Sequence, residues 1–305
     1  MPEPTAIDGV LVQWGDRLFY PGNRIVQEAS QPRLAARLIQ QRAAAIRARI
    51  AATVIRRAPQ VMVKVTGGGR GMRAIAAHFR YISKNGRLDI EDDRGETFKG
   101  RDDLRGLVED WRLGGTPIDE IGYRREALNI MLSMPRGVDP LAVQRAAREF
   151  AQAELAGHKY IMVLHDHQAN PHVHISVRAE SRTGKRLNPR KADLQRWRAR
   201  FAEALRGWGV EAEASSRTFR GQRRQFEPLW RIKARGEARL RNTRPQRDQK
   251  GPSMKEGVEG AWQSLAEALS KSAAKEDRDL GRAVERYIAS PSGRRVELTI
   301  EIHRR

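Results

Sequence analysis

Four of the chain's seven histidines lie within residues 160–177, YIMVLHDHQANPHVHISV. The apolar run that ends at Leu164 is typical of a buried strand, and residues 172–178 alternate with a period of two, as a half-buried strand does. The residues between them, Gln-Ala-Asn-Pro at 168–171, favour a tight turn. The stretch therefore predicts a β-hairpin with histidines on both of its strands.

The spacing of these histidines indicates a metal site. Residues i and i+2 of a strand point to the same face, so His172 and His174 should project side by side, and the hairpin should carry His165 back over them. Three neutral imidazoles held by a sheet suit a divalent transition metal and leave coordination positions open. The alternative is a histidine-rich hairpin on a hydrated sheet face. His167 falls in the turn, where it either contacts a metal-ligating histidine without binding the metal itself or is simply exposed.

The composition indicates a partner with many negative charges. The 305 residues include 58 Lys and Arg against 37 Asp and Glu, a net charge of +21. Nucleic acid is the first candidate and an anionic membrane surface the second. The sequence has no cysteine, which excludes disulfides, thiolate metal sites and a cysteine nucleophile. It shows neither an apolar run of about 18 residues nor a signal peptide, so we expect a cytoplasmic, bacterial protein without a membrane span.

A strand, a glycine-rich loop and a helix precede the hairpin. Residues 60–65 alternate as a strand does, and residues 72–84 carry an apolar stripe at helical spacing. The glycine cluster between them matches no nucleotide-binding loop, and it is expected near a DNA backbone. Tyr81 lies beside the apolar stripe, where Arg80 and Lys84 supply cations for a phenolate or a bound phosphate. The alternative for Tyr81 is ordinary packing in the core or at its rim.

The rest of the chain shows further elements. The patterns predict a loop and helix over 87–118, a strand over 126–134, a helix capped by Asp139 over 140–156 and a helix over 191–208. Residues 1–31 are expected to be irregular, and 32–57 to form a basic helix that either contacts phosphate or a partner, or packs on the domain. Residues 253–289 predict a separate helical piece, followed by a short strand at 294–303.

Residues 216–250 are strongly basic, with aromatic residues spaced among the arginines. Such a pattern suits phosphate contacts combined with base stacking, which favours DNA binding by Arg217, Arg220, Arg223 and Arg224. The alternative is a solvated basic helix over 227–241.

Two segments together resemble the relaxases of the VirD2/MobA type, the DNA-nicking enzymes of conjugative and mobilisable plasmids. They are FRYISKNG at residues 79–86 and, roughly 80 residues later, His165 followed by NPHVH at 170–174. Supporting segments are LSMPRG at 132–137 and SSRTFRG at 215–221. The resemblance covers a catalytic domain over 60–221, and leaves an N-terminal extension over 1–59 and a basic linker with a small helical region over 222–305.

The resemblance implies an α+β fold, with a central antiparallel sheet flanked by helices, of the palm-like kind found in histidine–hydrophobe–histidine endonucleases. It implies that Tyr81 attacks a scissile phosphodiester to form a 5′-phosphotyrosyl bond, with a divalent metal held by His165, His172 and His174. Mn or Mg is expected in use, and Zn or Ni fits the same ligands. A phenol ordinarily has a pKa near 10, so it needs such help. The implied partners are single-stranded and supercoiled DNA at a transfer origin, relaxosome accessory proteins and a coupling protein.

One position departs from the family pattern. Many members place an aspartate two residues after the first motif histidine to orient it, whereas here that residue is His167 and the acid stands one place earlier, at Asp166. The acidic partner is therefore open between Asp166, Glu126 and the acids of 89–93. Asn170 matches members that carry asparagine before the histidine pair. Arg80 and Lys84 are expected to steady the phosphate.

Two other functions were weighed against the relaxase. A rolling-circle replication initiator usually carries its histidine pair before the tyrosine, whereas here Tyr81 comes first. A non-catalytic, basic DNA-binding accessory protein would use the histidines as a structural metal site. A fused helicase or primase is excluded because the sequence holds no Walker motif.

Overall fold

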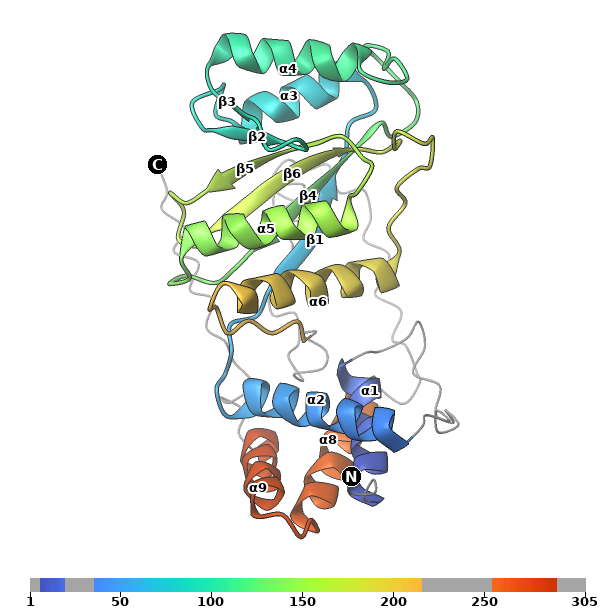
Figure 1. Ribbon diagram of the computed structural model, residues 1–305, viewed down its shortest axis with the longest axis vertical. Coiled ribbons are helices and arrows are strands. Elements are labelled where there is room, and N and C mark those ends of the chain that lie inside the picture. The colour runs from blue at the N-terminus through green and yellow to red at the C-terminus, as the bar shows by residue number, and fades with distance from the viewer. Residues whose placement is uncertain (1–5, 20–35, 216–253, 290–305) are drawn as a thin grey trace, which may run out of the picture. The chain divides into compact units, whose positions relative to one another are not determined.

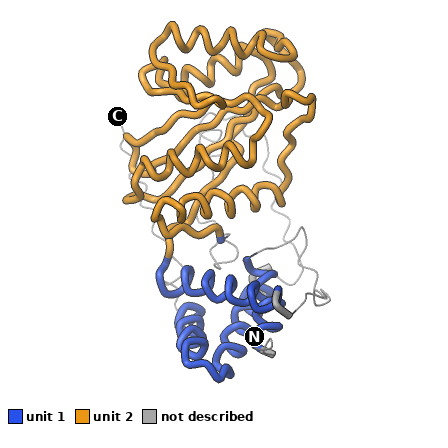
Figure 2. Tube along the Cα trace, in the orientation of Figure 1, with its two compact units in different colours: residues 1–57, 215–305 blue, residues 58–214 orange. Residues whose placement is uncertain are grey.

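The computed structural model describes residues 6–19, 36–215 and 254–289. Contacts divide the chain into two compact units, one formed by residues 58–214 and the other by 1–57 together with 215–305 (Figure 2). The first is called the sheet unit and the second the helical unit below. The sequence predicted boundaries at 59/60 and 221/222, and the independence of these parts as domains stays a prediction.

A six-stranded sheet organises the sheet unit (Figure 1). The strands lie in the order β1-β4-β6-β5-β2-β3, and all neighbours pair antiparallel. The predicted α+β fold with a central antiparallel sheet and flanking helices is confirmed. The strand bounds are Met62–Gly67 for β1, Ile90–Asp92 for β2, Thr97–Phe98 for β3, Ala127–Ser133 for β4, Tyr160–His165 for β5 and His172–Arg178 for β6.

The histidine hairpin forms the middle of this sheet. In the pairing of β5 with β6, His165 stands opposite His172 and Val163 opposite His174. The predicted hairpin and its two strands are therefore confirmed. The short strands β2 and β3 were not predicted, because residues 87–118 read as loop and helix. Both strands are too short to show an alternating pattern, and two of the buried residues of β2, Glu91 and Asp92, are charged residues that usually indicate an exposed segment.

Helices cover the two faces of the sheet unequally. Helices α5 (Pro140–Glu154) and α6 (Lys191–Gly207) pack against one face through Phe150, Trp197 and Phe201, and form one core with alternate residues of β1, β4, β5 and β6. Helices α3 (Met72–Ile82) and α4 (Arg101–Leu113) form a second core on the other face, with Ile161 and Val163 of β5 and with Ile90 of β2. As predicted, the Asp139 side chain caps α5 by accepting hydrogen bonds from the backbone N–H of Leu141 and Ala142.

The sheet unit begins and ends at the same place. The backbone N–H of Val61 donates to the carbonyl of Glu213 at 3.0 Å, and the N–H of Glu213 donates to the carbonyl of Pro59 at 2.9 Å. These two hydrogen bonds join the ends of the sheet unit. In the chain, the unit is inserted between the two segments that build the helical unit.

The helical unit combines helices from both ends of the chain. These are α1 (Ala6–Phe19), α2 (Ala36–Val54), α8 (Met254–Ser270) and α9 (Lys275–Ala289), which share one apolar core that includes Leu11, Ile46, Leu265 and Val284. The predicted irregular structure over 1–31 is wrong for residues 6–19. Apolar residues at positions 7, 11, 14 and 18 have helical spacing, which the glycines and polar residues among them obscured.

An arginine joins the two segments of the helical unit. The Arg47 guanidinium on α2 contacts Asp8 of α1 at 2.7 Å and both carboxylate oxygens of Asp277 of α9, at 2.7 and 2.9 Å. Arg42 of α2 pairs with Asp16 of α1 at 2.8 Å. Of the two interpretations of the basic helix, packing on neighbouring helices holds for these two arginines.

Several sequence predictions fall outside the described residues. They are the start of the 32–57 helix, the basic stretch 216–250 with its alternative helix 227–241, and the strand at 294–303. The helices predicted over 253–289 are confirmed as α8 and α9, but they are not a separate piece, because they share one core with α1 and α2. None of the helices in the described ranges is both long and apolar enough to cross a membrane.

We predict that Arg47→Met destabilises the helical unit by about 2 to 3 kcal/mol, because it removes charged hydrogen bonds from two nearly buried carboxylates. Hydrogen exchange should accelerate in peptides from 6–19, 36–54 and 254–289 and stay unchanged in 62–214. Arg47 holds the pKa of Asp277 below its ordinary value, so this stabilisation is present at neutral pH and is lost as the pH falls through that lowered pKa.

The matched control is Lys271→Met, which removes an exposed ion pair with Glu267 on α8 and should change exchange little. Equal acceleration in both variants, or acceleration spread over 62–214, would contradict the prediction.

Candidate metal centre and tyrosine helix

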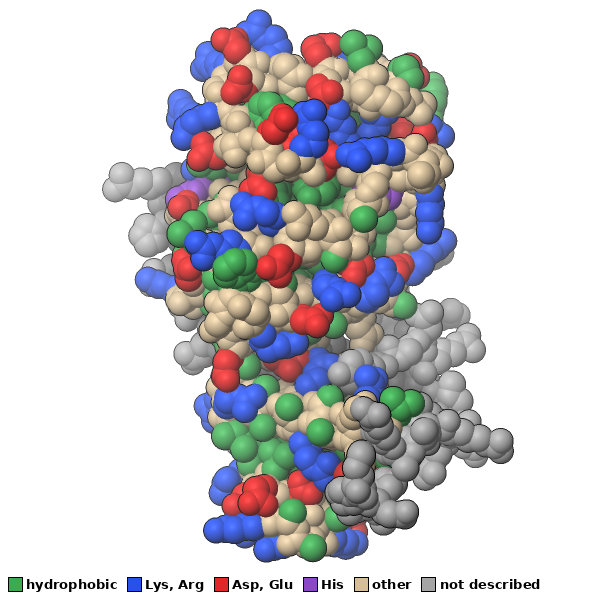
Figure 3. Space-filling model, in the orientation of Figure 1, with side chains coloured by type: hydrophobic (Ala, Val, Ile, Leu, Met, Phe, Trp, Pro, Cys, Tyr) green, Lys and Arg blue, Asp and Glu red, His purple; other side chains and the backbone are tan. Residues whose placement is uncertain are grey.

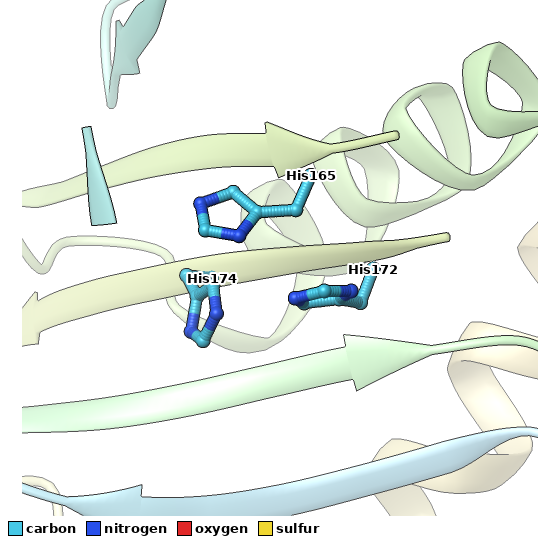
Figure 4. A group of neighbouring side chains, drawn as sticks. All are labelled: His165, His172 and His174. Atoms are coloured by element: carbon cyan, nitrogen blue, oxygen red, sulfur yellow. The ribbon is translucent and has the colours of Figure 1, made fainter. Parts of the chain in front are cut away.

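Three histidines converge on one face of the sheet, called the site face below (Figure 4). The ring centroids of His165 and His172 lie 4.9 Å apart, those of His165 and His174 4.7 Å, and those of His172 and His174 5.0 Å. One ring nitrogen from each lies within 4.8 Å of the others. Because β5 and β6 hold all three Cα atoms in register, the sheet itself fixes this spacing.

Backbone carbonyls select the tautomers of two of these histidines. His165 Nε2 donates to the carbonyl oxygen of Ile82 at 2.6 Å, and His172 Nδ1 donates to that of Asn170 at 2.9 Å. A neutral imidazole has one N–H and one lone pair, so His165 Nδ1 and His172 Nε2 are left as lone-pair donors. The buried Nδ1 atoms of His165 and His174 have no hydrogen-bond partner among the described residues.

Burial keeps all three rings neutral. Desolvation lowers the pKa of His165 and of His172, and it lowers the pKa of His174 to about 3, with a further contribution from the neighbouring histidines. Neutral imidazoles with unused lone pairs are what a transition metal requires. The donor set therefore fits a divalent metal ion, and three protein ligands leave positions for water or substrate.

Helix α3 presents Tyr81 next to this cluster. Met72, Ile75, Phe79 and Ile82 are buried against the sheet and α4, and the Phe79 ring meets that of Trp111 edge-on at 4.8 Å. This packing turns the opposite side of the helix outward, so that Tyr81 is 71% exposed. The carbonyl that accepts from His165 belongs to Ile82, the residue after Tyr81. One residue of α3 therefore carries the phenol, and the next one anchors the histidine cluster.

The segment after Tyr81 ends the helix sharply. The Ser83 hydroxyl donates to the Phe79 carbonyl at 2.7 Å and accepts from the Gly86 N–H at 3.0 Å. Lys84, Asn85 and Gly86 all have positive φ, of 50°, 59° and 81°. A side chain at Gly86 would also collide with the backbone of Gly100. Asn85-Gly86 therefore forms the stop, and its geometry keeps the tyrosine end of α3 in place.

Sequence reasoning missed His78. It lies one turn before Tyr81 on α3, with the two rings stacked at a centroid distance of 6.3 Å and an interplanar angle of 29°. Its ring also meets that of His174 edge-on at 6.3 Å. The signal that could have found it is the three-residue spacing from Tyr81, which places two residues on one helical face.

The glycine-rich loop supports packing instead of phosphate binding. The N–H groups of Met72 and Arg73, which begin α3, donate to the carbonyls of Asp119 and Glu120. A side chain at Gly68 or Gly71 would collide with the backbone carbonyl of Ala127 or of Glu120. Neighbouring backbone therefore occupies these donors at the start of α3, and the expectation that the loop lies near a DNA backbone stays a prediction.

The structure places the acidic candidates away from the ligand nitrogens. Asp166 is exposed and lies 3.9 Å from His167, not from His165. Glu126 pairs with Arg124 and Arg186 before the start of β4, whereas Ser133 at the other end of β4 stands opposite His172. Glu91 pairs with Arg148, Asp92 with Arg94 and Asp93 with Arg182. The carbonyls of Ile82 and Asn170 take the orienting place that an acid was expected to fill.

The basic candidates divide into two groups. Arg80 and Lys84 are exposed at the tyrosine end of α3, and Lys84 is close enough to contribute electrostatically to the lowered pKa of His165. Arg217, Arg220, Arg223 and Arg224 lie outside the described residues. In the view of Figure 3, basic and acidic side chains are interspersed over α4, α5 and α6, so no single-sign surface forms there.

An antiparallel sheet carries three neutral histidines beside a helix with an exposed tyrosine. Residues 96–210 match the family model described as "Relaxase: MobA/VirD2-like, nuclease domain", which confirms the resemblance and supports a relaxase-type assignment for this part of the chain. No curated protein matches the chain. The matched range includes the three histidines and β4 to β6 but neither β1 nor α3, so the case for Tyr81 depends on its geometry.

We predict that the chain binds one divalent ion, tested by calorimetric titration with Mn, Zn or Ni. His172→Ala or His174→Ala should weaken binding at least tenfold, because each removes one of three ligands. His167→Ala is the matched control, since its ring is 5.2 Å from that of His165 but lies outside the cluster. Weakening by His167→Ala alone would contradict the assignment.

Proposed function

We propose that this chain is a relaxase that nicks one strand of DNA at a plasmid transfer origin by metal-dependent tyrosine transesterification. The observation that carries the proposal is the hydrogen bond from His165 Nε2 to the carbonyl of Ile82, which places the residue after Tyr81 on one of the metal-site histidines. The match to a relaxase nuclease domain supports DNA nicking in general.

The proposed step exchanges one phosphodiester for another. The Tyr81 hydroxyl oxygen attacks phosphorus, and the bond from phosphorus to the 3′ oxygen breaks. The products are a 5′-phosphotyrosyl bond and a free 3′-OH. The phenol proton passes to water, which the exposure of Tyr81 permits, and the departing 3′ oxygen gains a proton from water. Because one ester replaces another, the reverse step rejoins the strand without an external energy source.

His165, His172 and His174 would hold the metal, which supplies Lewis-acid polarisation of the non-bridging phosphate oxygens. Arg80 and Lys84 face solvent at the same end of α3 and add two positive charges for the phosphate. The pairing of β5 with β6 holds the histidines in place, and burial of the rings keeps them neutral. These ligands therefore reorganise little when substrate binds.

The wider setting belongs to the same proposal. The sheet unit is the catalytic domain, acting in the bacterial cytoplasm on supercoiled and single-stranded DNA with relaxosome accessory proteins and a coupling protein. A net charge of +21 supports a nucleic-acid partner. Against a rolling-circle initiator stands the order of the chain, with Tyr81 before the histidines. A non-catalytic accessory protein would work equally well without the Tyr81 hydroxyl.

We predict that Tyr81→Phe abolishes nicking of a supercoiled plasmid that bears the chain's own transfer origin, with a loss of at least a thousandfold. The substitution removes the attacking oxygen alone, so single-stranded DNA binding should stay within about threefold. Wild-type reactions with Mn or Mg, stopped by detergent and protease, should yield open circles with a blocked 5′ end, and EDTA should prevent them. Unchanged nicking by Tyr81→Phe would refute the assignment of the nucleophile.

We predict that His78→Ala lowers the turnover of nicking about tenfold with little change in KM for an oligonucleotide, because the ring that Tyr81 stacks on is lost. His78→Phe keeps an aromatic ring and should recover most of the rate. A wild-type rate in His78→Ala together with a low rate in His78→Phe would show that the ring does not position Tyr81. Ala77→Ser, on the exposed side of α3, serves as the control.

A further inference from the structure

Among the described residues, the helices α3 and α4 cover only part of the site face. Buried residues of α3 and α4 pack over β5 and β2, whereas site-face residues of β1 and β4 remain open. On β1, Lys64 and Thr66 are exposed, and on β4, Asn129 and Met131 are partly exposed. The register places Met131 opposite His174 and Asn129 opposite Ser176, on the same face as the histidines. A partly exposed floor, with Met131 and then Asn129, therefore continues from the metal site along β4.

The Asn129 side chain contacts β6 through its amide oxygen. Its Oδ1 accepts a hydrogen bond at 3.2 Å from the hydroxyl of Ser176, which is almost fully buried. The Thr66 hydroxyl donates to the backbone carbonyl of Asn129 from the neighbouring strand. With Oδ1 engaged, the amide offers the N–H donors of Nδ2, which make no hydrogen bond within the described part of the chain.

An open space lies over Asn129. Its partner on β1 is Gly67, and a register shift between Val65 and Gly67 interrupts the pairing at this point. Among the described residues, and apart from its neighbours in the chain, a side-chain carbon added at Gly67 would have the Asn129 Nδ2 atom, at 3.9 Å, as its one neighbour within 4 Å. The φ of Gly67 is outside the left-handed region, so the backbone would tolerate a side chain there. Bulges next to sites often make such room.

The space lies one nucleotide step from the metal site. Asn129 and Met131 are two residues apart on β4, so the row of Asn129 and Ser176 lies about 7 Å from the row of Met131 and His174. An extended single strand with its phosphate at the histidines would therefore bring a neighbouring base over Asn129. The amide has donors to offer that base, and the missing side chain at Gly67 leaves room for it.

We propose that Asn129 reads one base beside the scissile phosphate at the exocyclic group on purine C6 or pyrimidine C4. Nδ2 donates to the oxygen that guanine or thymine carries there, whereas adenine and cytosine carry an amino group, which is itself a donor. The inference rests on the proposed relaxase function and adds a specificity-determining residue to it. Ser176 acts through Asn129 as a positioning residue, because its hydroxyl keeps Oδ1 away from the base. Gly67 contributes by the absence of a side chain.

The test is selection of bound sequences from a pool of random single-stranded oligonucleotides, with Tyr81→Phe in every protein so that binding is measured without cleavage. The pool bound by this background should show one position enriched in guanine and thymine. Asn129→Asp keeps the Ser176 hydrogen bond but replaces the donors by an acceptor. It should shift that position to the amino bases, adenine and cytosine, with about a tenfold change in their ratio.

Two further variants separate base reading from general effects. Gln144→Glu on α5 adds the same negative charge on the opposite face of the sheet unit and should leave the selected sequence unchanged. Gly67→Leu fills the space and should erase the preference at that position without reversing it. Thermal unfolding of each variant should stay close to that of the background protein, which shows that altered selection does not come from misfolding.

The outcomes separate the two proposals. A keto preference that Asn129→Asp reverses supports the inference. The same enriched sequence from the background protein and from Asn129→Asp overturns it, while wild-type nicking of the transfer origin would still support the relaxase. Failure of the background protein to bind or enrich any oligonucleotide, together with absence of nicking by the wild type, overturns both.

Discussion

The hydrogen bond between His165 Nε2 and the carbonyl of Ile82 connects two segments that are 83 residues apart in sequence. It fixes the tautomer of His165, and it fixes the end of α3 against β5. Both groups are buried, so losing the bond would leave an unsatisfied carbonyl as well as an unsatisfied imidazole. The site thus depends on a contact that neither the hairpin nor the helix makes alone.

The same alternation that builds the sheet also separates core from site. Along β6, Val173, Ile175 and Val177 enter the core under α5 and α6, and His172 and His174 face the other way. Desolvation by burial then lowers the pKa of each of the three histidines. Packing that stabilises the fold therefore also prepares the rings as neutral ligands, without any separate device for that purpose.

The sequence contained the local features of the site but not its long-range contacts. The hairpin, the helix that carries Tyr81 and its stop at Asn85-Gly86 follow from period and turn chemistry, which act over a few residues. The carbonyls that orient His165 and His172 carry no side-chain signal, so reasoning from residue types searched for an acid instead. His78 was not predicted because its role depends on contacts with the rings of Tyr81 and His174, and His174 comes close to it only in the folded chain. Helix α1 was missed because much of its core is supplied by α8, from the far end of the chain.

Replacing an acidic partner by backbone carbonyls changes the electrostatics of the site. A carboxylate behind a metal-bound histidine places a negative charge near the substrate phosphate and makes the imidazole more basic. The carbonyls of Ile82 and Asn170 orient the rings equally well but carry no net charge. Of the acidic candidates, Asp166 is exposed and lies near His167, and Glu91 is paired with Arg148. An ion held by these three histidines would keep its full charge toward a polyanionic strand, with Lys84 adding to it. Such a site would favour binding of a phosphate and would have less basic ligands, so its affinity for the ion would depend more on the geometry that β5 and β6 set.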